Sequence, residues 1–358
     1  MTPLSTQPLT AWGIPPGELM VIAGPCSAES REQVLETARG LAPLKIHVFR
    51  AGVWKPRTRP GTFEGAGVEA LAWVKEAGVA TGRPVAVEVA TTAHIEAALK
   101  AGIDILWIGA RTSTNPIQMS ELAGALRGAD VPVLVKNPIN PDVQLWLGAL
   151  ERLAAAGVRR LGAIHRGFST HARGAYRNDP IWRIPLELRR LAPGVPLLCD
   201  PSHISGTVGL IEAVAQNALD LLFDGLMIEA HRDPAAALSD AQQQLTPADL
   251  GALLGRLVRR SPSSSSDEYR ARISALRLEM DEVDHGIIGL LASRMSIARR
   301  IAAVQKSNNV AAFQPDRWQA TLESRTREGV EKGLDGEFME ELYALIHEET
   351  LRHKTEMP

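Results

Sequence analysis

Short apolar runs alternate with longer stretches of helical periodicity along most of the 358-residue chain. The apolar runs are bounded by glycine, proline and polar residues, which is typical of buried strands. The segments between them, such as VEALAWVKEAG and TAHIEAALKAG, are amphipathic and of helical length. This regular alternation predicts parallel strands joined by helices. The eight predicted strands are residues 19–24, 47–52, 85–89, 105–109, 133–137, 161–166, 196–200 and 226–231.

Eight repeats of strand and helix predict a closed (β/α)8 TIM barrel of the α/β class, because strand count and length both fit that fold. A doubly wound open sheet is the alternative. Such a sheet usually binds its ligand at one switch point, whereas polar residues here follow nearly every predicted strand. The pattern therefore favours the barrel.

The apolar pattern changes after SPSSSS, residues 261–266, a polar run that we expect to be a flexible linker. Apolar residues then recur at spacings of three and four over residues 267–306, which predicts one helix about 60 Å long. Shorter helices are predicted at residues 316–332 and 336–353. The long helix cannot bury its apolar stripe on two short partners, so we expect a three-helix domain that forms an interlocked dimer. The predicted domains are a barrel at 1–258, a linker at 259–266 and an all-α domain at 267–358.

Composition and charge exclude several classes of protein. Hydrophobic residues make up 45% of the chain and charged residues 22%, as in ordinary globular proteins. Lys and Arg (39) nearly balance Asp and Glu (41), so we expect no nucleic-acid or membrane partner. No apolar run is long enough to span a membrane, no signal peptide is evident, and two cysteines make no disulfide framework. We therefore expect a cytoplasmic protein.

Four residues near the ends of strands 1, 7 and 8 are candidate metal ligands, since loops converge at the C-terminal ends of barrel strands. Cys26, His203, Glu229 and Asp240 offer one sulfur, one nitrogen and two carboxylates, a set suited to several divalent metals. Taken singly, Cys26 fits a small buried residue and His203 a capping or hydrogen-bonded loop residue. Strands 1, 7 and 8 are neighbours in a closed barrel, which makes a metal site the stronger hypothesis. Manganese is the favoured ion, with iron, cobalt and zinc as alternatives.

Six cationic side chains also lie at or just after the C-terminal ends of the predicted strands. Six cations close together at one end of the barrel would repel one another unless anions were bound there. The alternative, that they are ordinary solvent-exposed surface residues, is poor for residues at the ends of apolar strands. We therefore predict one or two ligands carrying several negative charges, such as phosphates and a carboxylate. The six residues are Arg50, Lys55, Arg57, Arg111, Lys136 and Arg166.

The motifs GPCS, FRAGVWKPRT, IGARTSTN, LVKN, CDPSH, MIEAH and LSDAQQ occur in this order. With them, the barrel region resembles 3-deoxy-D-arabino-heptulosonate 7-phosphate (DAHP) synthase of the short type I-beta kind. The resemblance implies metal-dependent condensation of phosphoenolpyruvate with erythrose 4-phosphate, the first step of the shikimate pathway to aromatic amino acids. The related 3-deoxy-manno-octulosonate 8-phosphate synthase is a remote alternative. The motif KPRT argues against it.

The same resemblance assigns roles to the candidate residues. It makes Cys26, His203, Glu229 and Asp240 the metal ligands, with Lys55, Cys26 and His203 catalytic. It implies that phosphoenolpyruvate is held by Arg50, Lys55, Arg111, Lys136 and Arg166, and that erythrose 4-phosphate meets Pro56, Arg57 and Thr58.

The helical tail resembles the all-α chorismate mutase family in RISALRLEMDEVD, LLASRM and IHEET. The resemblance implies conversion of chorismate to prephenate at a site formed by Arg277, Arg294, Arg317 and Thr350, with Arg277 reaching into the partner's site. Where the family has a lysine and a glutamine that donate to the ether oxygen, this chain has Gln305 and Lys354. We hypothesise that the two side chains have exchanged roles.

Three roles for the tail remain open. It is a working mutase, or an inactive domain that binds chorismate or prephenate and restrains the barrel, or a purely structural dimerisation module. The arginines in register argue against the third role. Feedback by chorismate or prephenate is compatible with the first two. We expect a homo-oligomer, a dimer through the helical domain, with a tetramer through the barrels as a further arrangement.

Overall fold

A computed structural model describes residues 4–55, 61–170 and 174–355 of the chain. It divides into two compact units, Met1–Pro262 and Ser263–Pro358, which are described separately. The predicted residues Pro56, Arg57 and Thr58 lie outside the described part.

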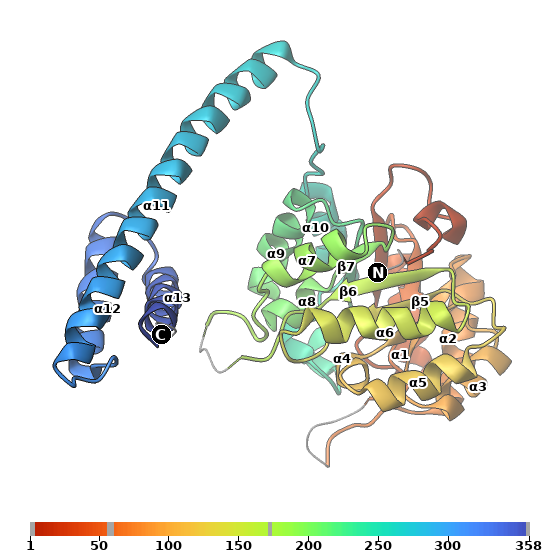
Figure 1. Cartoon of the computed structure of the whole chain (residues 1–358). Coiled ribbons are helices and arrows are strands. Elements are labelled where there is room, and N and C mark those ends of the chain that lie inside the picture. The colour runs from red at the N-terminus through yellow and green to blue at the C-terminus, as the bar shows by residue number, and fades with distance from the viewer. Residues whose placement is uncertain (1–3, 56–60, 171–173, 356–358) are drawn as a thin grey trace. The chain divides into compact units, whose positions relative to one another are not determined.

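The first unit is a closed barrel of eight parallel strands paired in chain order, with β1 hydrogen-bonded to β8, which confirms the predicted TIM barrel (Figure 1). Each predicted strand overlaps an observed one. The strands are β1 (Met20–Gly24), β2 (Val48–Arg50), β3 (Val85–Val89), β4 (Ile105–Ile108), β5 (Val133–Lys136), β6 (Leu161–His165), β7 (Leu197–Cys199) and β8 (Gly225–Glu229).

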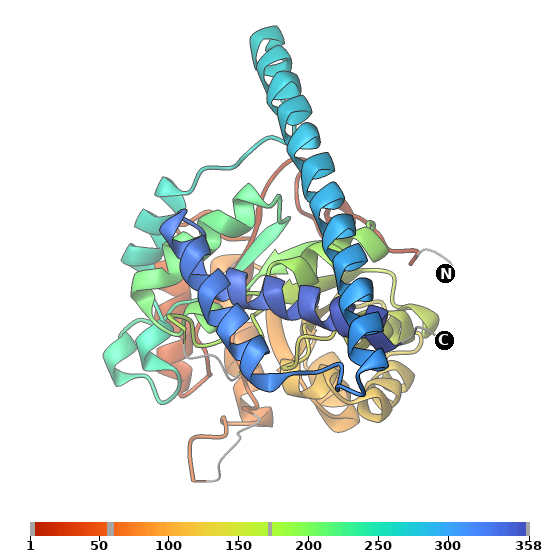
Figure 2. The same cartoon turned by 60° about the vertical axis from the view of Figure 1, so that its left-hand side comes forward.

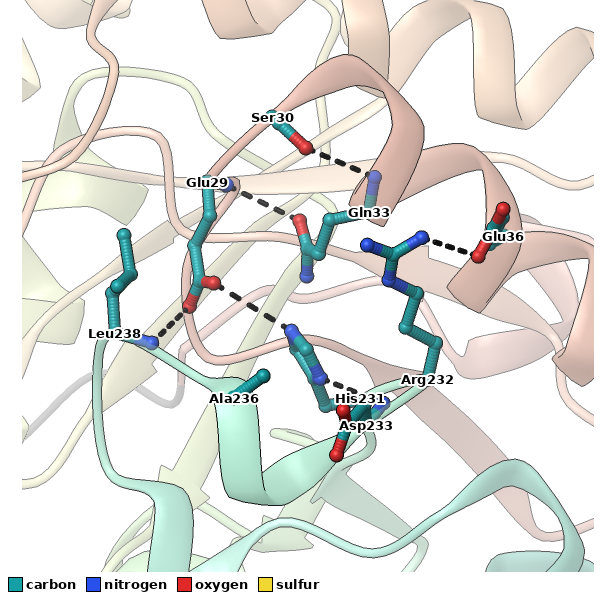
Figure 3. A pocket seen from close by; sticks show the side chains of 9 residues that line it. All are labelled: Glu29, Ser30, Gln33, Glu36, His231, Arg232, Asp233, Ala236 and Leu238. Atoms are coloured by element: carbon teal, nitrogen blue, oxygen red, sulfur yellow. Dashed lines mark hydrogen bonds and ion pairs between the residues drawn. The ribbon is translucent and has the colours of Figure 1, made fainter.

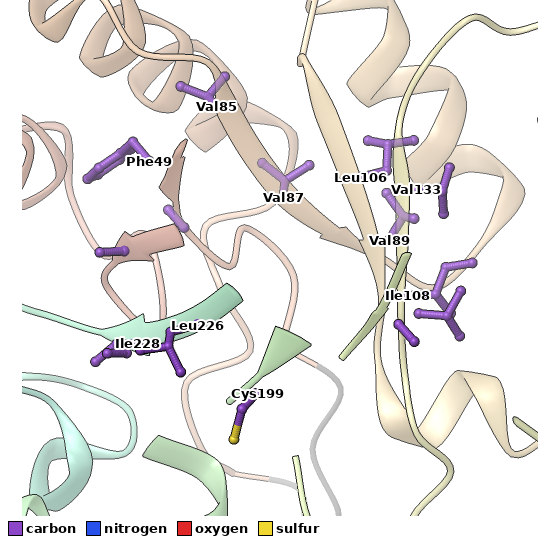
Figure 4. Packing of buried hydrophobic residues seen from close by; sticks show 14 of the residues in the cluster. Phe49, Val85, Val87, Val89, Leu106, Ile108, Val133, Cys199, Leu226 and Ile228 are labelled. Atoms are coloured by element: carbon purple, nitrogen blue, oxygen red, sulfur yellow. The ribbon is translucent and has the colours of Figure 1, made fainter. Parts of the chain in front are cut away.

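Helices surround the barrel, and side chains along the strands alternate between the two sides of the sheet. Residues such as Met20, Ile22 and Trp107 fill the interior, where a short 3-10 helix, η1 (Leu9–Trp12), packs against them. Outward residues such as Val85, Val87 and Leu106 pack against the helices (Figure 4). The helices are α1 (Arg31–Leu41), α2 (Val68–Thr81), α3 (Thr92–Lys100), α4 (Ala110–Ser113), α5 (Pro116–Ala125), α6 (Val143–Ala155), α7 (Arg183–Leu191), α8 (Pro201–Ser205), α9 (Val208–Asp220) and α10 (Pro247–Arg256).

Several of these helices begin where a polar side chain accepts a hydrogen bond from a backbone N–H of the first turn. Ser30 caps α1 and Asp200 caps α8 in this way. The cap of α8 matters most for function, because it fixes a short helix directly after β7, at the C-terminal end of the barrel.

The second unit consists of three helices, α11 (Asp267–Ser307), α12 (Pro315–Glu331) and α13 (Gly336–Thr355). In both views the N-terminal half of α11 extends beyond α12 and α13 (Figure 2). Apolar side chains from this half to just past the middle of the helix are exposed, among them Leu276, Met280, Val283, Ile287 and Leu290. The single chain thus leaves this stripe uncovered, and the interlocked dimer stays a prediction. Among the described residues, no helix has the length and apolar character needed to cross a membrane.

Candidate functional site

Cys26 is positioned by the tight approach of β1 to β2. A Cβ atom on Gly24, whose φ is +151°, would lie 2.0 Å from the carbonyl oxygen of Arg50, so only glycine allows this approach. The Cys26 N–H then donates to Gln244 Oε1 at 2.9 Å. The side chain is fully buried, and this burial raises the pKa of the Cys26 thiol to about 12. The sulfur therefore has a fixed place, and in the absence of a metal ion its protonated form is favoured.

Three of the four predicted metal ligands converge on one point. The ligand atoms of Cys26, Glu229 and Asp240 all lie within 4.8 Å of one another, and Cys26 Sγ is 3.2 Å from Asp240 Oδ2. Glu229 ends β8 with no exposed surface, and its Oε1 atom accepts no hydrogen bond from the residues that the structure describes. A buried carboxylate oxygen that accepts no hydrogen bond, although the Arg50 guanidinium lies 3.3 Å away, suits coordination of a cation.

His203 completes the predicted set from the side of β7. Asp200 accepts from the backbone N–H of His203 at 3.0 Å, and its carboxylate lies 2.9 Å from Nδ1. This contact assigns the Nδ1 proton to the hydrogen bond and leaves the lone pair of Nε2 facing Glu229 Oε1 at 3.7 Å. A carboxylate behind a histidine is the arrangement that orients metal-bound imidazoles. The sulfur, nitrogen and carboxylate donors therefore fit a divalent transition metal.

Asp240 is held on two sides in a conformation that is unusual for a residue other than glycine, with φ +47° and ψ 38°. Glu29 accepts from the N–H of Leu238 at 2.8 Å (Figure 3). Ser27 Oγ lies 2.5 Å from Ser239 Oγ. These bonds tie the segment before Asp240 to the segment after Cys26. The two ligands are thereby fixed relative to each other, although they are far apart in the sequence.

The five predicted cations that the structure describes lie at the same end of the barrel, and three of them contact a carboxylate or the Cys26 sulfur. Arg50 Nη2 is 3.3 Å from Glu229 Oε1, and its guanidinium lies 4.6 Å from the ring centroid of Trp107. Lys55 Nζ is 2.9 Å from Cys26 Sγ. Lys136 Nζ is 2.7 Å from Asp200 Oδ2. The Nε and Nη1 atoms of Arg50 are buried and have no acceptor within the described ranges.

The other two described cations, Arg166 and Arg111, differ in burial and in their surroundings. Arg166 directly follows β6, and burial lowers its pKa to about 10. Its Nη1 atom donates to Asn178 Oδ1 at 2.6 Å. Arg111 is exposed in α4.

Sequence reasoning missed several residues that hold the predicted ligands. Asp200 and Gln243 stand in the motifs CDPSH and LSDAQQ, so their neighbours could have drawn attention to them. Gln243 is fully buried and donates to Glu229 Oε2 at 2.7 Å. Arg177 and Asn178 lie in the segment between β6 and α7, where no spacing rule marks them.

A second cavity is formed within the helical unit, where α11, α12 and α13 each contribute predicted residues. Arg294, Arg317, Thr350 and Lys354 line it together. Arg294 Nη1 donates to Thr350 Oγ1 at 2.5 Å. Arg277 is exposed and lies outside this cavity, about 26 Å from Arg294 along the helix axis.

The hypothesised exchange partners are in contact. Lys354 Nζ donates to Gln305 Oε1 at 3.1 Å and to the carbonyl oxygen of Ala312 at 3.1 Å. The cavity also has a feature that the sequence did not indicate, since Trp318 stacks on His347 with ring centroids 4.0 Å apart. The combination is a small cavity rich in cations, which suits an anionic ligand.

In comparisons with known proteins, the two parts of the chain match two different families. The model of the DAHP synthetase I family matches residues 15–260, and the model of chorismate mutase type II matches residues 276–355. The phospho-2-dehydro-3-deoxyheptonate aldolase of Thermotoga maritima is 32% identical over 229 residues, which are 64% of this chain and 66% of that protein. The chain therefore spans slightly less than two thirds of this relative.

Two further similarities concern the barrel. A crystal structure of the Thermotoga maritima aldolase, described there as a DAHP synthase, has a TM-score of 0.61 at 30% identity and covers 68% of each chain. The 2-dehydro-3-deoxyphosphooctonate aldolase of Syntrophotalea carbinolica is 28% identical over 247 residues, covering 63% of this chain and 84% of that protein.

Proposed function

We propose that this chain, which belongs to the DAHP synthetase I family and carries a chorismate mutase type II region, is a bifunctional enzyme. Its barrel condenses phosphoenolpyruvate with erythrose 4-phosphate to DAHP and phosphate, and its helical unit converts chorismate to prephenate. The observation that carries the first activity is the convergence of Cys26, Glu229 and Asp240 within 4.8 Å, beside His203 and a set of buried cations.

The four predicted ligands would hold a divalent metal ion, with manganese the favoured one. Such an ion supplies Lewis-acid polarisation of the aldehyde oxygen of erythrose 4-phosphate. Asp200 keeps the lone pair of His203 Nε2 directed at the site, and Gln243 fixes the second carboxylate oxygen of Glu229. The donor set is thus oriented by hydrogen bonds of the chain itself.

The cations bind and orient the phosphoenolpyruvate anion. Arg50 offers two buried N–H-bearing atoms that lack acceptors among the described residues, and Arg166 and Lys136 lie at neighbouring strand ends. Charge-assisted hydrogen bonds from them would hold the phosphate and carboxylate, so that C3 of the enol faces the aldehyde carbon. As the C–C bond forms, water adds at C2, and the C2–O bond to phosphate then breaks.

Lys55 is the ammonium closest to the candidate ligand set. Burial disfavours its charge, but Cys26 and Glu229 outweigh burial and raise the pKa of Lys55 above its ordinary value. It therefore stays protonated and can give a proton to the aldehyde oxygen as that atom becomes a hydroxyl.

The test of the synthase proposal is phosphate release from the two substrates by full-length protein after treatment with a chelator. We expect no product without metal, recovery with Mn²⁺, and no recovery in a Cys26→Ala variant that retains chorismate turnover. Full activity in the metal-free protein would refute the metal dependence. A preference for a pentose phosphate over erythrose 4-phosphate would instead favour the octulosonate 8-phosphate synthase alternative.

The helical unit supports the second activity through the cavity lined by Arg294, Arg317, Thr350 and Lys354. A pericyclic rearrangement requires no covalent step, so a cavity that clamps two carboxylates and stabilises the ether oxygen is sufficient. The exposed stripe on α11 supports an interlocked dimer in which the partner subunit supplies the arginine at position 277. Chorismate loss followed by absorbance tests the activity, and sedimentation tests the dimer.

The alternative for this unit is a regulatory domain without turnover. It would bind chorismate or prephenate in the same cavity and lower the synthase rate. Absence of chorismate turnover in folded protein, together with inhibition of phosphate release by prephenate, would favour this alternative. Turnover with inhibition would indicate a mutase that also provides feedback control.

A further inference from the structure

The dipeptide Arg177-Asn178 is fixed against the helix that carries His203. The N–H of Arg177 donates to the carbonyl of Ser205 at 3.4 Å, and the N–H of Asn178 donates to that of Ile204 at 3.1 Å. Two glycines with positive φ allow the close approach. A Cβ atom at Gly167 would lie 2.5 Å from the carbonyl oxygen of Asn178, and one at Gly206 would lie 2.5 Å from Cβ of Arg177.

Arg177 reaches the two carboxylate ligands from outside the candidate metal site. Its Nη1 atom lies 3.0 Å from Asp240 Oδ1 and 2.7 Å from Gln243 Oε1. Gln243 in turn donates to Glu229 Oε2 at 2.7 Å. The Arg177 guanidinium therefore orients Asp240 directly, and it orients Glu229 through the side-chain amide of Gln243.

Asn178 reaches the candidate phosphoenolpyruvate site instead. Its Oδ1 atom accepts from Arg166 Nη1 at 2.6 Å, and its Nδ2 atom donates to the backbone carbonyl of His203 at 2.7 Å. Asn178 is 8% exposed, so both bonds are protected from water. A shift of Arg166 toward a bound anion would act on the backbone of His203 through this single amide.

We propose that Arg177 and Asn178 are positioning residues that couple the binding of the metal to the binding of phosphoenolpyruvate. The inference rests on the proposed synthase function. The two side chains together connect one substrate-binding arginine with three of the four predicted metal ligands. Each ligand would order the segment that the other requires, so the coupling is reciprocal and each ligand tightens the other by the same factor.

The experiment measures binding of Mn²⁺ to metal-free full-length protein with and without phosphoenolpyruvate, by titration of free Mn²⁺ with electron paramagnetic resonance. Erythrose 4-phosphate is left out, so phosphoenolpyruvate is not consumed. For the wild type we expect phosphoenolpyruvate to lower the Kd of Mn²⁺ about tenfold, within the usual range of couplings between sites. Calorimetry of phosphoenolpyruvate binding with and without Mn²⁺ must give the same factor.

Arg177→Lys keeps the charge, but its side chain is one bond shorter and places no nitrogen where Arg177 Nη1 contacts both Asp240 and Gln243. Arg183→Lys on the exposed start of α7 is the matched control. For Arg177→Lys we expect Mn²⁺ affinity to fall roughly tenfold or more, as for other groups that orient metal ligands, and the coupling factor to approach one. Asn178→Ala should abolish the coupling as well, with phosphoenolpyruvate affinity reduced. Arg183→Lys should match the wild type in both quantities.

A merely structural role predicts lower thermal stability with an unchanged coupling factor, and that result would overturn the inference. The thiolate-to-metal absorption of the Co²⁺-loaded protein gives an independent readout, which should change in Arg177→Lys and stay constant in Arg183→Lys. Should Asn178→Ala fail to fold, the result for Arg177→Lys still decides. If the wild type binds neither Mn²⁺ nor phosphoenolpyruvate, the proposed function itself fails; if it binds both without coupling, only this inference fails.

Discussion

Replacement of Lys354 by alanine tests whether the helical unit has redistributed the two groups that face the ether oxygen of chorismate. The Lys354 ammonium donates to Gln305 Oε1 and to the Ala312 carbonyl, each at 3.1 Å. These two bonds use two of its three N–H groups, which leaves one for a ligand in the cavity. The contact also orients the Gln305 amide, since its oxygen accepts from Lys354 while its Nε2 donates to the Ala311 carbonyl at 3.1 Å.

The expected magnitudes separate catalysis from stability. Lys354 is only partly buried, so loss of its hydrogen bonds should cost about 1 kcal/mol of folding free energy. A preorganised donor to a charge that develops in the transition state is worth about 2.7–4 kcal/mol, or a 10²- to 10³-fold change in kcat. We therefore expect Lys354→Ala to lose at least about 99% of its turnover while it remains folded.

The reciprocal exchange supplies the second half of the test. Gln305→Lys alone places two ammonium groups side by side, at a cost of up to about 4 kcal/mol before solvent screening, and should also impair turnover. Gln305→Lys combined with Lys354→Gln restores one ammonium and one amide and should recover activity to within about tenfold of the wild type, a non-additivity that a double-mutant cycle measures.

Chorismate loss by absorbance is the assay, with circular dichroism as the check on folding. Lys332→Ala is the control, since Lys332 is an exposed lysine that pairs with Glu328 outside the cavity. An undiminished kcat in Lys354→Ala would refute the reasoning, as would a double variant no more active than either single variant.

Three further predictions concern packing, orientation and pH. Gly167→Ala should lower the unfolding free energy of the barrel by about 1–3 kcal/mol more than Gly157→Ala in urea titrations, because both have positive φ but only Gly167 faces an atom of Asn178 at 2.5 Å. Asp200→Asn should weaken Mn²⁺ binding roughly 10- to 100-fold by titration, because it loosens the candidate histidine ligand, and should destabilise the barrel by about 3–5 kcal/mol by leaving a buried lysine without its anion. Burial, and then the neighbouring Lys354 and Arg294, lower the pKa of His347, so the unfolded chain binds more protons below about pH 6.5. The helical unit should therefore melt at a lower temperature at about pH 5.5 than at about pH 7.5, and His347→Gln should reduce that difference.

The barrel and the three helices were predictable because each depends on a periodic signal. Alternation of apolar strands with amphipathic helices specifies the parallel barrel, since such strands must be covered on the outside and packed within. The long helix was predicted at residues 267–306 and is observed at Asp267–Ser307, where Ser266 accepts from the Tyr269 N–H. Local rules of periodicity and capping were sufficient here, because tertiary contacts did not oppose them.

The candidate site was predictable only where residue chemistry is distinctive. Thiol, imidazole and carboxylate groups at strand ends indicate metal coordination by their type alone. Gln243 and Asn178 carry amides, which occur in many settings, so their roles depend on contacts between segments distant in sequence. Arg177 shows the limit best, because its link to Asp240 joins residues 63 positions apart across two loops.

The charges at the barrel mouth show why repulsion among cations is weaker evidence for a ligand than the sequence suggested. Arg50, Lys55 and Lys136 each have an anionic or thiol partner of the protein within 3.3 Å, because closure of the barrel brings distant strand ends together. Buried charges of both signs can therefore neutralise one another without substrate. A substrate anion must therefore compete with these internal partners for the same cations, and part of its binding energy is used to displace them.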